Sequence, residues 1–188
     1  MPSSDINMVP KVVSLVTSIF PKSVLDVGVG NGRYGFLFRE CLDMNYGRML
    51  KDSWEFVIDG VEAEESYITE VHRYCYNDII ISDWLKYIPE RKYDLIFMGD
   101  VLEHWQDGEW QNALNKARAK SALTIVVSPN WKGSIAQGAW EGNERERHRV
   151  VLSPELVGGR CLYANSKMFM CGFDNFGLGV FDSKDICL

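Results

Sequence analysis

Glycines that follow a short apolar run near the N-terminus form the part of the sequence best suited to binding a ligand. The segment Ser23 to Gly35 reads S-V-L-D-V-G-V-G-N-G-R-Y-G. Its first residues predict a strand that is buried on both faces. The glycines after that strand allow the backbone to turn tightly and to approach a bound nucleotide-like molecule; they are Gly28, Gly30 and Gly32. A following helix would direct its N-terminal amides toward the same molecule.

The spacing of the glycines fits two kinds of nucleotide site, and Asp26 separates them. Gly30, Gly32 and Gly35 match the dinucleotide pattern G-x-G-x-x-G. Asp26, however, stands two residues before the first glycine, where a carboxylate repels a pyrophosphate and suits a cation. The run L-D-V-G-V-G-N-G resembles the first motif of class I S-adenosylmethionine-dependent methyltransferases, whose cofactor has a sulfonium and no phosphate. The resemblance implies that S-adenosylmethionine is the cofactor, becoming S-adenosylhomocysteine, and that its site includes Asp26, Gly28, Gly30, Asn31 and Gly32.

A second apolar strand, Phe56 to Ala63, carries a candidate ligand for the ribose hydroxyls. Glu62 is our choice, because an acid at the end of this strand accepts hydrogen bonds from a ribose. It lies 36 residues after Asp26, whereas about 20 residues separate a glycine turn from its ribose acid in a compact unit. We therefore expect an insertion at Asp43 to Trp54. Asp59, in the middle of the strand, is the rival ribose ligand.

Three further strands end in residues that extend the resemblance. Strand Asp78 to Ser82 is followed by Asp83 and Trp84, which in the methyltransferase pattern bond the adenine amino group and flank the adenine ring. Strand Tyr93 to Asp100 is followed by V-L-E-H, and strand Leu123 to Asn130 comes next. V-L-E-H resembles a motif of the small-molecule methyltransferases of ubiquinone and menaquinone biosynthesis. The resemblance also implies that Asp100 belongs to the cofactor site.

Two histidines are candidates for moving a proton during catalysis. His104 follows the carboxyl end of a strand, where ligands bind in open α/β sheets, and its ordinary pKa suits proton transfer near neutrality. The alternative is that it only shapes the pocket. His148 is the second candidate, although it also fits a solvated run of charged residues, E-R-E-R-H-R.

Alternating apolar strands and helical segments predict βαβ units and a parallel sheet. The expected helices are Asp5 to Ile19, Tyr34 to Leu42, Ser66 to Tyr76, Asp107 to Lys120 and Pro154 to Val157. Lys167 to Phe173 and Gly177 to Asp182 predict two strands joined by a loop short enough to make them antiparallel. The predicted fold is a three-layer α/β/α Rossmann-like sandwich with a seven-stranded, mostly parallel sheet and an antiparallel C-terminal hairpin.

The chain reads as one domain, residues 1–188, with an N-terminal helical segment at 1–22 that packs on the domain. Residues 131–153 form its least regular part and hold several glycines and two tryptophans, Trp131 and Trp140, which we expect to close over an apolar acceptor. Long loops inside compact domains are usually functional or disordered. We expect this loop to be a lid over an apolar acceptor.

Composition restricts the partners. A net charge of −6 offers no broad basic surface, so nucleic acid is disfavoured as a substrate. No apolar stretch approaches the roughly 20 residues that a membrane span needs, and we expect a cytoplasmic protein. Five dispersed cysteines suggest reduced thiols, and with only three histidines no metal site is expected.

These patterns together predict an S-adenosylmethionine-dependent methyltransferase that acts on a small-molecule acceptor. Two alternatives remain open at this point. One is a methyltransferase-like module that binds cofactor or a partner without turnover. The other is an NAD(P)-dependent oxidoreductase, which Asp26 opposes.

Overall fold

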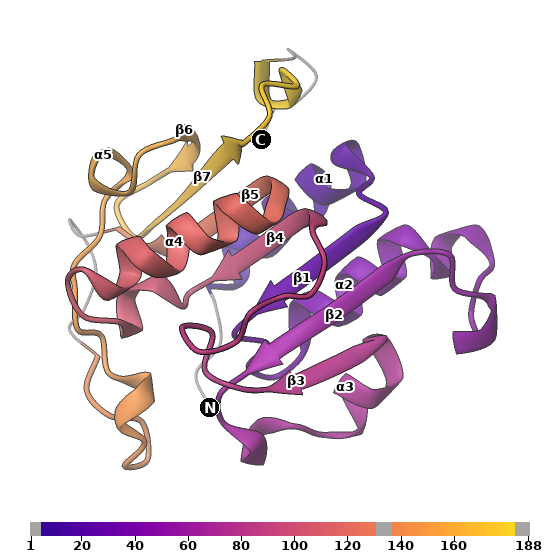
Figure 1. Ribbon diagram of the computed structural model, residues 1–188, viewed down its shortest axis with the longest axis horizontal. Helices are drawn as coiled ribbons and strands as arrows, with labels where there is room; N and C mark the ends of the chain where they lie inside the picture. The colour runs from indigo at the N-terminus through magenta and orange to yellow at the C-terminus, as the bar shows by residue number, and fades with distance from the viewer. Residues whose placement is uncertain (1–4, 131–136, 183–188) are drawn as a thin grey trace.

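A sheet of seven strands forms the centre of the molecule (Figure 1). The computed structural model describes residues 5–130 and 137–182. The strands are β1 (Ser23–Val27), β2 (Val57–Glu62), β3 (Asp78–Ile81), β4 (Tyr93–Gly99), β5 (Ser121–Pro129), β6 (Arg160–Ala164) and β7 (Met168–Asp174). Their order in the sheet is β3-β2-β1-β4-β5-β7-β6.

The first five strands are parallel, and the last two run against them. β1 pairs with β2 and β4, and the pairs β2–β3 and β4–β5 are also parallel. β7 is antiparallel to both β5 and β6. The strand order reverses its direction between β1 and β4, which makes the carboxyl ends of these two strands the expected place for a ligand.

Helices cover both faces of the sheet and create two hydrophobic cores. The helices are α1 (Val9–Ile19), α2 (Arg33–Leu42), α3 (Glu70–Cys75), α4 (Glu109–Lys120) and α5 (Pro154–Val157). α1, α2 and α3 pack on one face, where Phe38 and Phe97 are fully buried. α4 and α5 pack on the other face, around Trp110 and Phe169. α4 lies in front of the sheet in Figure 1, with α1 and α2 behind it. The predicted three-layer architecture is confirmed.

The antiparallel hairpin exists, but one of its strands was predicted in the wrong place. β7 pairs with Arg160–Ala164 instead of with residues 177–182. Gly177 and Gly179 both have a φ of +68°, which extended strands do not adopt. The Asp174 carboxylate accepts hydrogen bonds from the amides of Phe176 and Val180, at 3.3 Å each, and thereby turns the chain away from the sheet.

The expected insertion after α2 forms two short 3₁₀ turns, Met44–Tyr46 and Lys51–Ser53. It is anchored by fully buried Arg39, which pairs with buried Asp43 and donates to the Phe56 carbonyl at 2.9 Å.

Every helix in residues 5–130 and 137–182 is too short or too polar to cross a membrane.

Candidate functional site

A cavity of about 560 Å³ opens at the carboxyl ends of β1, β2 and β4. Its walls include the glycine loop after β1, Glu62 at the end of β2, and residues 99–104 after β4. A smaller cavity of about 90 Å³ shares Gly28, Glu62 and His104 with it and extends to Asp83 and Trp84. The structure therefore brings most of the predicted site residues to one edge of the sheet.

The glycine loop needs its glycines for conformation and for space. Gly28 and Gly30 have φ values of +76° and +53°, in the left-handed region that other residues rarely adopt. A β-carbon on Gly28 would also lie 2.9 Å from a methyl carbon of Val101. Asn31 accepts a hydrogen bond from the Arg33 amide at 3.1 Å and so fixes the start of α2. The loop can therefore present its backbone closely to a ligand.

Glu62 connects the glycine loop to the end of β2. One carboxylate oxygen accepts a hydrogen bond from the Gly30 amide, and the other accepts one from the Glu64 amide, both at 3.0 Å. Burial raises the pKa of Glu62, and these backbone hydrogen bonds oppose the shift. Asp59, its rival, is bonded instead by Arg91 and by the Tyr93 hydroxyl, and lines neither cavity. Of the two acids, only Glu62 faces the cavities.

Asp26 lies beneath the glycine loop and lines neither cavity. Its side chain is 2% exposed and accepts a hydrogen bond from the Tyr76 hydroxyl at 2.5 Å. Burial raises the pKa of Asp26 to about 7, against the opposing effect of the Tyr76 hydrogen bond. Gly35 makes room for the tyrosine, because a β-carbon there would lie 2.0 Å from the Tyr76 ring. Asp26 is thus held by Tyr76, which packs against Gly35 in the first turn of α2.

His72 supports the same loop and was not identified from the sequence. Its Nε2 lies 3.0 Å from the Gly30 carbonyl and donates to it, since its Nδ1 accepts from the Thr69 amide at 3.0 Å. Burial lowers the pKa of His72, which favours this neutral form. The sequence signal was the spacing T-x-x-H at the start of α3, where Thr69 and His72 form a capping box.

The predicted adenine residues border the smaller cavity. Asp83 accepts a hydrogen bond from the Leu85 amide at 2.9 Å and pairs with Arg145 at 3.4 Å. Trp84 is 2% exposed, and its indole donates to the Ala113 carbonyl at 3.1 Å. The tryptophan is therefore fixed against α4 as part of the core, and contributes to the cavity wall from that position.

Asp100 directly follows β4 and has a conformation that is unusual for a residue other than glycine. Its φ is +52°, and its amide donates to the Val127 carbonyl at 2.9 Å. Backbone conformations of this kind are costly and concentrate at functional sites. Asp100 lines the larger cavity, and its contact with a cofactor stays a prediction.

The larger cavity is rich in acids. In the described part of the chain, its walls contain one guanidinium, Arg33, and five carboxylates: Asp5, Glu62, Asp100, Glu103 and Glu146. Such a lining attracts cations and repels phosphate groups. The preference for a cationic ligand that was inferred from Asp26 thus comes from residues that face the cavity, because Asp26 itself lines neither cavity and its pKa is raised to about 7.

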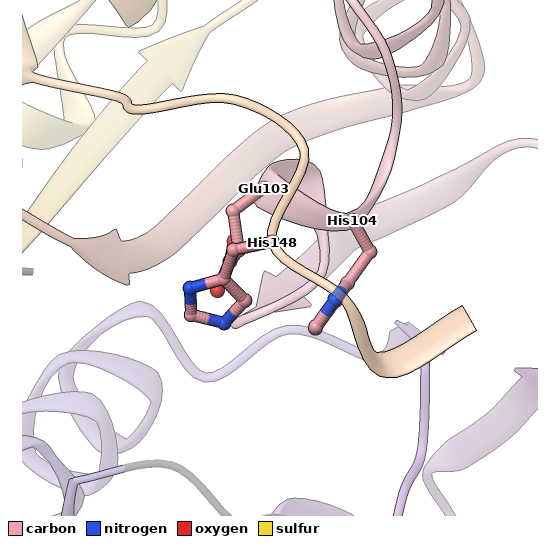
Figure 2. Close-up of side chains that lie close together, drawn as sticks. All are labelled: Glu103, His104 and His148. Atoms are coloured by element: carbon pink, nitrogen blue, oxygen red, sulfur yellow. The ribbon is translucent and has the colours of Figure 1, made fainter. Parts of the chain in front are cut away.

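Glu103, His104 and His148, called the Glu-His-His cluster below, meet in the same cavity (Figure 2). Glu103 and His104 come from the turn after β4, and His148 comes from a distant segment. Burial raises the pKa of Glu103 to about 7. Burial, followed by the nearby His104, lowers the pKa of His148 to about 4. Both histidines were predicted from the sequence, whereas Glu103 was not, because only the fold brings residue 148 to the turn that carries Glu103.

The predicted lid is described from residue 137 onward; residues 131–136 lie outside the described residues. In Figure 1 the segment after residue 137 runs past the carboxyl ends of the parallel strands. Gln137, Glu146 and His148 line the larger cavity, and the His148 amide donates to the Gln137 carbonyl at 3.0 Å. Trp140, which was expected to contact an acceptor, is 44% exposed and lines neither cavity.

Comparison with known proteins identifies the fold. No family model and no curated protein matches the sequence. The DhpI–SAH complex superposes with a TM-score of 0.65 at 15% identity, over 88% of this chain and 83% of that one. The methyltransferase domain of bacterial CtHen1-C gives 0.62 at 19% identity, over 90% and 98%. The N-methyltransferase NodS from Bradyrhizobium japonicum WM9 gives 0.56 at 10% identity, over 89% and 93%.

Proposed function

We propose that this chain, which has the class I methyltransferase fold, transfers a methyl group from S-adenosylmethionine to a small-molecule acceptor. The observation that carries the proposal is the acid-rich cavity at the carboxyl ends of β1, β2 and β4, bounded by the glycine loop and Glu62. When bound, the cofactor supplies a methyl group on a sulfonium, which is a good leaving group. Two structural neighbours support this choice, since DhpI and the plantazolicin methyltransferase BamL are each described in complex with SAH.

Glu62 has the hydrogen-bonding capacity that a ribose requires. An ionised carboxylate offers about four acceptor positions. The amides of Gly30 and Glu64 take two of them, which leaves two for the two ribose hydroxyls. Because Glu62 is already held by the backbone, it does not lose further side-chain freedom when the ribose binds.

The remaining cofactor groups have matching surfaces. Gly28 and Gly30 offer close backbone approach, and the carboxylates of the larger cavity, Asp100 among them, attract the sulfonium and the ammonium. Asp83 and Trp84 border the smaller cavity, where we assign the adenine. Asp26 acts indirectly, by holding Tyr76, which packs against Gly35 in the first turn of α2.

His104 and His148 stand on the acceptor side of the larger cavity. Their ring centroids are 5.0 Å apart at an interplanar angle of 67°. Methyl transfer needs little covalent help from a protein beyond positioning the nucleophile and excluding water. We assign that positioning to these rings, together with the removal of the acceptor's proton. The segment 137–153 is our proposed acceptor loop, because it contributes Gln137, Glu146 and His148 to the wall.

Isothermal titration calorimetry tests the cofactor assignment. We expect one molecule of S-adenosylhomocysteine to bind per chain, and NAD⁺ or NADP⁺ not to bind, because the acid-rich cavity repels a pyrophosphate. Binding of a nicotinamide dinucleotide without binding of S-adenosylhomocysteine would contradict the proposal.

A second assay separates an enzyme from a silent cofactor-binding module. The protein is incubated with S-adenosylmethionine that carries a radiolabelled methyl group and with a panel of small hydroxyl, amine and thiol acceptors. Labelled product supports the enzyme. Cofactor binding without product across a broad panel favours the silent module.

A further inference from the structure

We propose that the Glu-His-His cluster is a binding site for a divalent transition-metal ion, with Zn²⁺ as the representative ion. One carboxylate oxygen and two imidazole nitrogens would hold the ion at the wall of the larger cavity. The proposed metal binding depends on these three residues alone. The proposed effect of the ion on an acceptor rests, in addition, on the methyl transfer proposed above.

The three ligand atoms are close enough to converge on one ion. Each residue offers one ligand atom, and these atoms all lie within 4.8 Å of one another. Zinc binds imidazole nitrogen and carboxylate oxygen at about 2.0–2.2 Å in tetrahedral sites, which sets the ligand atoms roughly 3.3–3.5 Å apart. Side-chain rotations that shorten the longest separation by about 1.5 Å would therefore complete the site. Figure 2 shows the three side chains close together, on two segments of the chain.

Neighbouring groups already orient the ligands. The Ser128 hydroxyl donates to Oε2 of Glu103 at 3.0 Å, which leaves Oε1 as the ligand atom. Nδ1 of His104 lies 3.2 Å from the Arg147 carbonyl. A carbonyl only accepts hydrogen bonds, so Nδ1 carries the proton and Nε2 keeps its lone pair for a metal. Hydrogen bonds of this kind, from the far side of each ligand, are typical of protein metal sites.

The burial of Glu103 is unexplained without a ligand. Its side chain is 2% exposed, and Oε1 has no hydrogen-bond partner among the described residues. A buried carboxylate oxygen without a partner is costly, and such groups are usually paired or coordinate metals. A bound cation satisfies this oxygen directly.

The donor set selects the class of ion. Two imidazoles and one carboxylate suit Zn²⁺, Fe²⁺, Mn²⁺ or Ni²⁺, whereas Mg²⁺ and Ca²⁺ prefer oxygen ligands. Three protein ligands leave at least one coordination position, and all three residues line the larger cavity. Open positions of this kind are typical of catalytic metal sites.

An ion there would bind an acceptor through oxygen. With the ion bound, both imidazoles would be ligands and neither could accept the acceptor's proton. We therefore expect the acceptor to present a hydroxyl that coordinates the ion and loses its proton to solvent, because a metal ion lowers the pKa of a bound oxygen. The oxygen then forms a bond to the methyl carbon while the carbon–sulfur bond breaks, and the sulfonium becomes a thioether. The oxidation state of the metal does not change.

Histidine NMR gives the most selective test, because the chain has three histidines. Protein labelled with ¹⁵N in its histidines is stripped with a chelator and titrated with Zn²⁺ alone. We expect the ring resonances of His104 and His148 to shift and to saturate at one equivalent. His72, which is bonded on both ring nitrogens, is the internal control and should not shift. Saturable shifts confined to His72, or no shift at millimolar Zn²⁺, would overturn the proposal.

Variants then assign the ligands by calorimetry with Zn²⁺. We expect His148→Gln and Glu103→Gln each to weaken Zn²⁺ binding by roughly a hundredfold or more. Removing a group that only hydrogen-bonds to a metal ligand already lowers metal affinity about 10–100-fold. Glu70→Gln, which removes an exposed carboxylate on α3, should leave it unchanged. Unchanged affinity in both cluster variants would refute the site. Glu103 is buried, so Glu103→Gln could fail to fold, whereas His148 lies in a loop where a substitution is better tolerated. Thermal melting of both variants shows whether each is folded.

The metal site and the proposed function fail separately. S-adenosylhomocysteine binding to the metal-free protein tests the proposed function, and Zn²⁺ binding without cofactor tests the cluster. Zn²⁺ binding in a protein that does not bind S-adenosylhomocysteine supports the site and contradicts the function. The reverse result contradicts the site alone.

Discussion

Replacing Asp26 with Asn should change how stability depends on pH. Asp26 is buried under the glycine loop, and its pKa is raised from 3.8 to about 7. The folded protein therefore holds a proton on Asp26 between these two pH values, while the unfolded chain does not. A raised folded-state pKa contributes stability that is fully present below pH 3.8 and is lost as pH rises through 7.

The size of the effect follows from the shift. About three pKa units, at 1.36 kcal/mol each, correspond to roughly 4 kcal/mol of unfolding free energy lost between pH 4 and pH 8. Asn cannot ionise, but its carbonyl oxygen can still accept the Tyr76 hydrogen bond. As pH rises from 4 to 8, wild type should therefore lose stability that Asp26→Asn keeps. The unfolding free energy of the variant, relative to wild type, should increase over this range by up to about 4 kcal/mol.

Urea unfolding, followed by tryptophan fluorescence at several pH values from 4.5 to 8, measures this difference. Asp52→Asn removes an exposed acid from a 3₁₀ turn and is the matched control, for which the difference should stay flat. If the Asp26→Asn difference is also flat, Asp26 ionises in the folded protein as readily as in the unfolded chain. The account of a protonated Asp26–Tyr76 pair would then be wrong.

Three other substitutions test separate parts of the structure. Glu62→Ala should weaken S-adenosylhomocysteine binding by about 1.5–3 kcal/mol, the range for hydrogen bonds to a charged group, with exposed Glu65→Ala as its control; equal affinities in calorimetry would exclude the ribose role. Arg39→Met should destabilise the fold by about 3–5 kcal/mol in urea titrations, because it removes one of the two guanidinium groups that pair with buried Asp43 and the donor that satisfies the carbonyls of Phe56 and Cys75; a loss below about 1 kcal/mol would contradict this. His104→Ala should slow methyl transfer roughly 10²–10⁴-fold with S-adenosylhomocysteine affinity kept, as expected of a residue that activates the acceptor, either by accepting its proton or by holding the metal ion. Loss of cofactor affinity instead would make the residue part of the cofactor pocket.

The sequence predicted the parts of the fold that depend on neighbours along the chain. The five parallel strands were found because each is a short apolar run followed by a polar residue or glycine; four of them are buried, and the edge strand β3 is partly exposed. The glycine loop was found because a left-handed φ leaves few choices of residue at Gly28 and Gly30. Glu62 and Asp100 line the cavity because they stand at the carboxyl ends of parallel strands, where ligands bind in open α/β sheets.

Contacts between distant residues were not predictable in the same way. The partner of Asp26 is Tyr76, 50 residues along the chain, and no local pattern links them. His148 meets Glu103 only because its segment lies over the ends of the strands. One strand of the C-terminal hairpin was misplaced because G-L-G-V-F-D alternates like a strand. This segment instead turns away from the sheet, because the Asp174 carboxylate accepts hydrogen bonds from the amides of Phe176 and Val180.

A crystal structure of the protein with S-adenosylhomocysteine tests the central claim most directly. The account predicts that the nucleoside lies in the cavities at the carboxyl ends of β1, β2 and β4, with both ribose hydroxyls within hydrogen-bond distance of the Glu62 carboxylate. The thioether should face the Glu-His-His cluster. Clear ligand density elsewhere on the molecule, or a ribose that does not contact Glu62, would contradict the account.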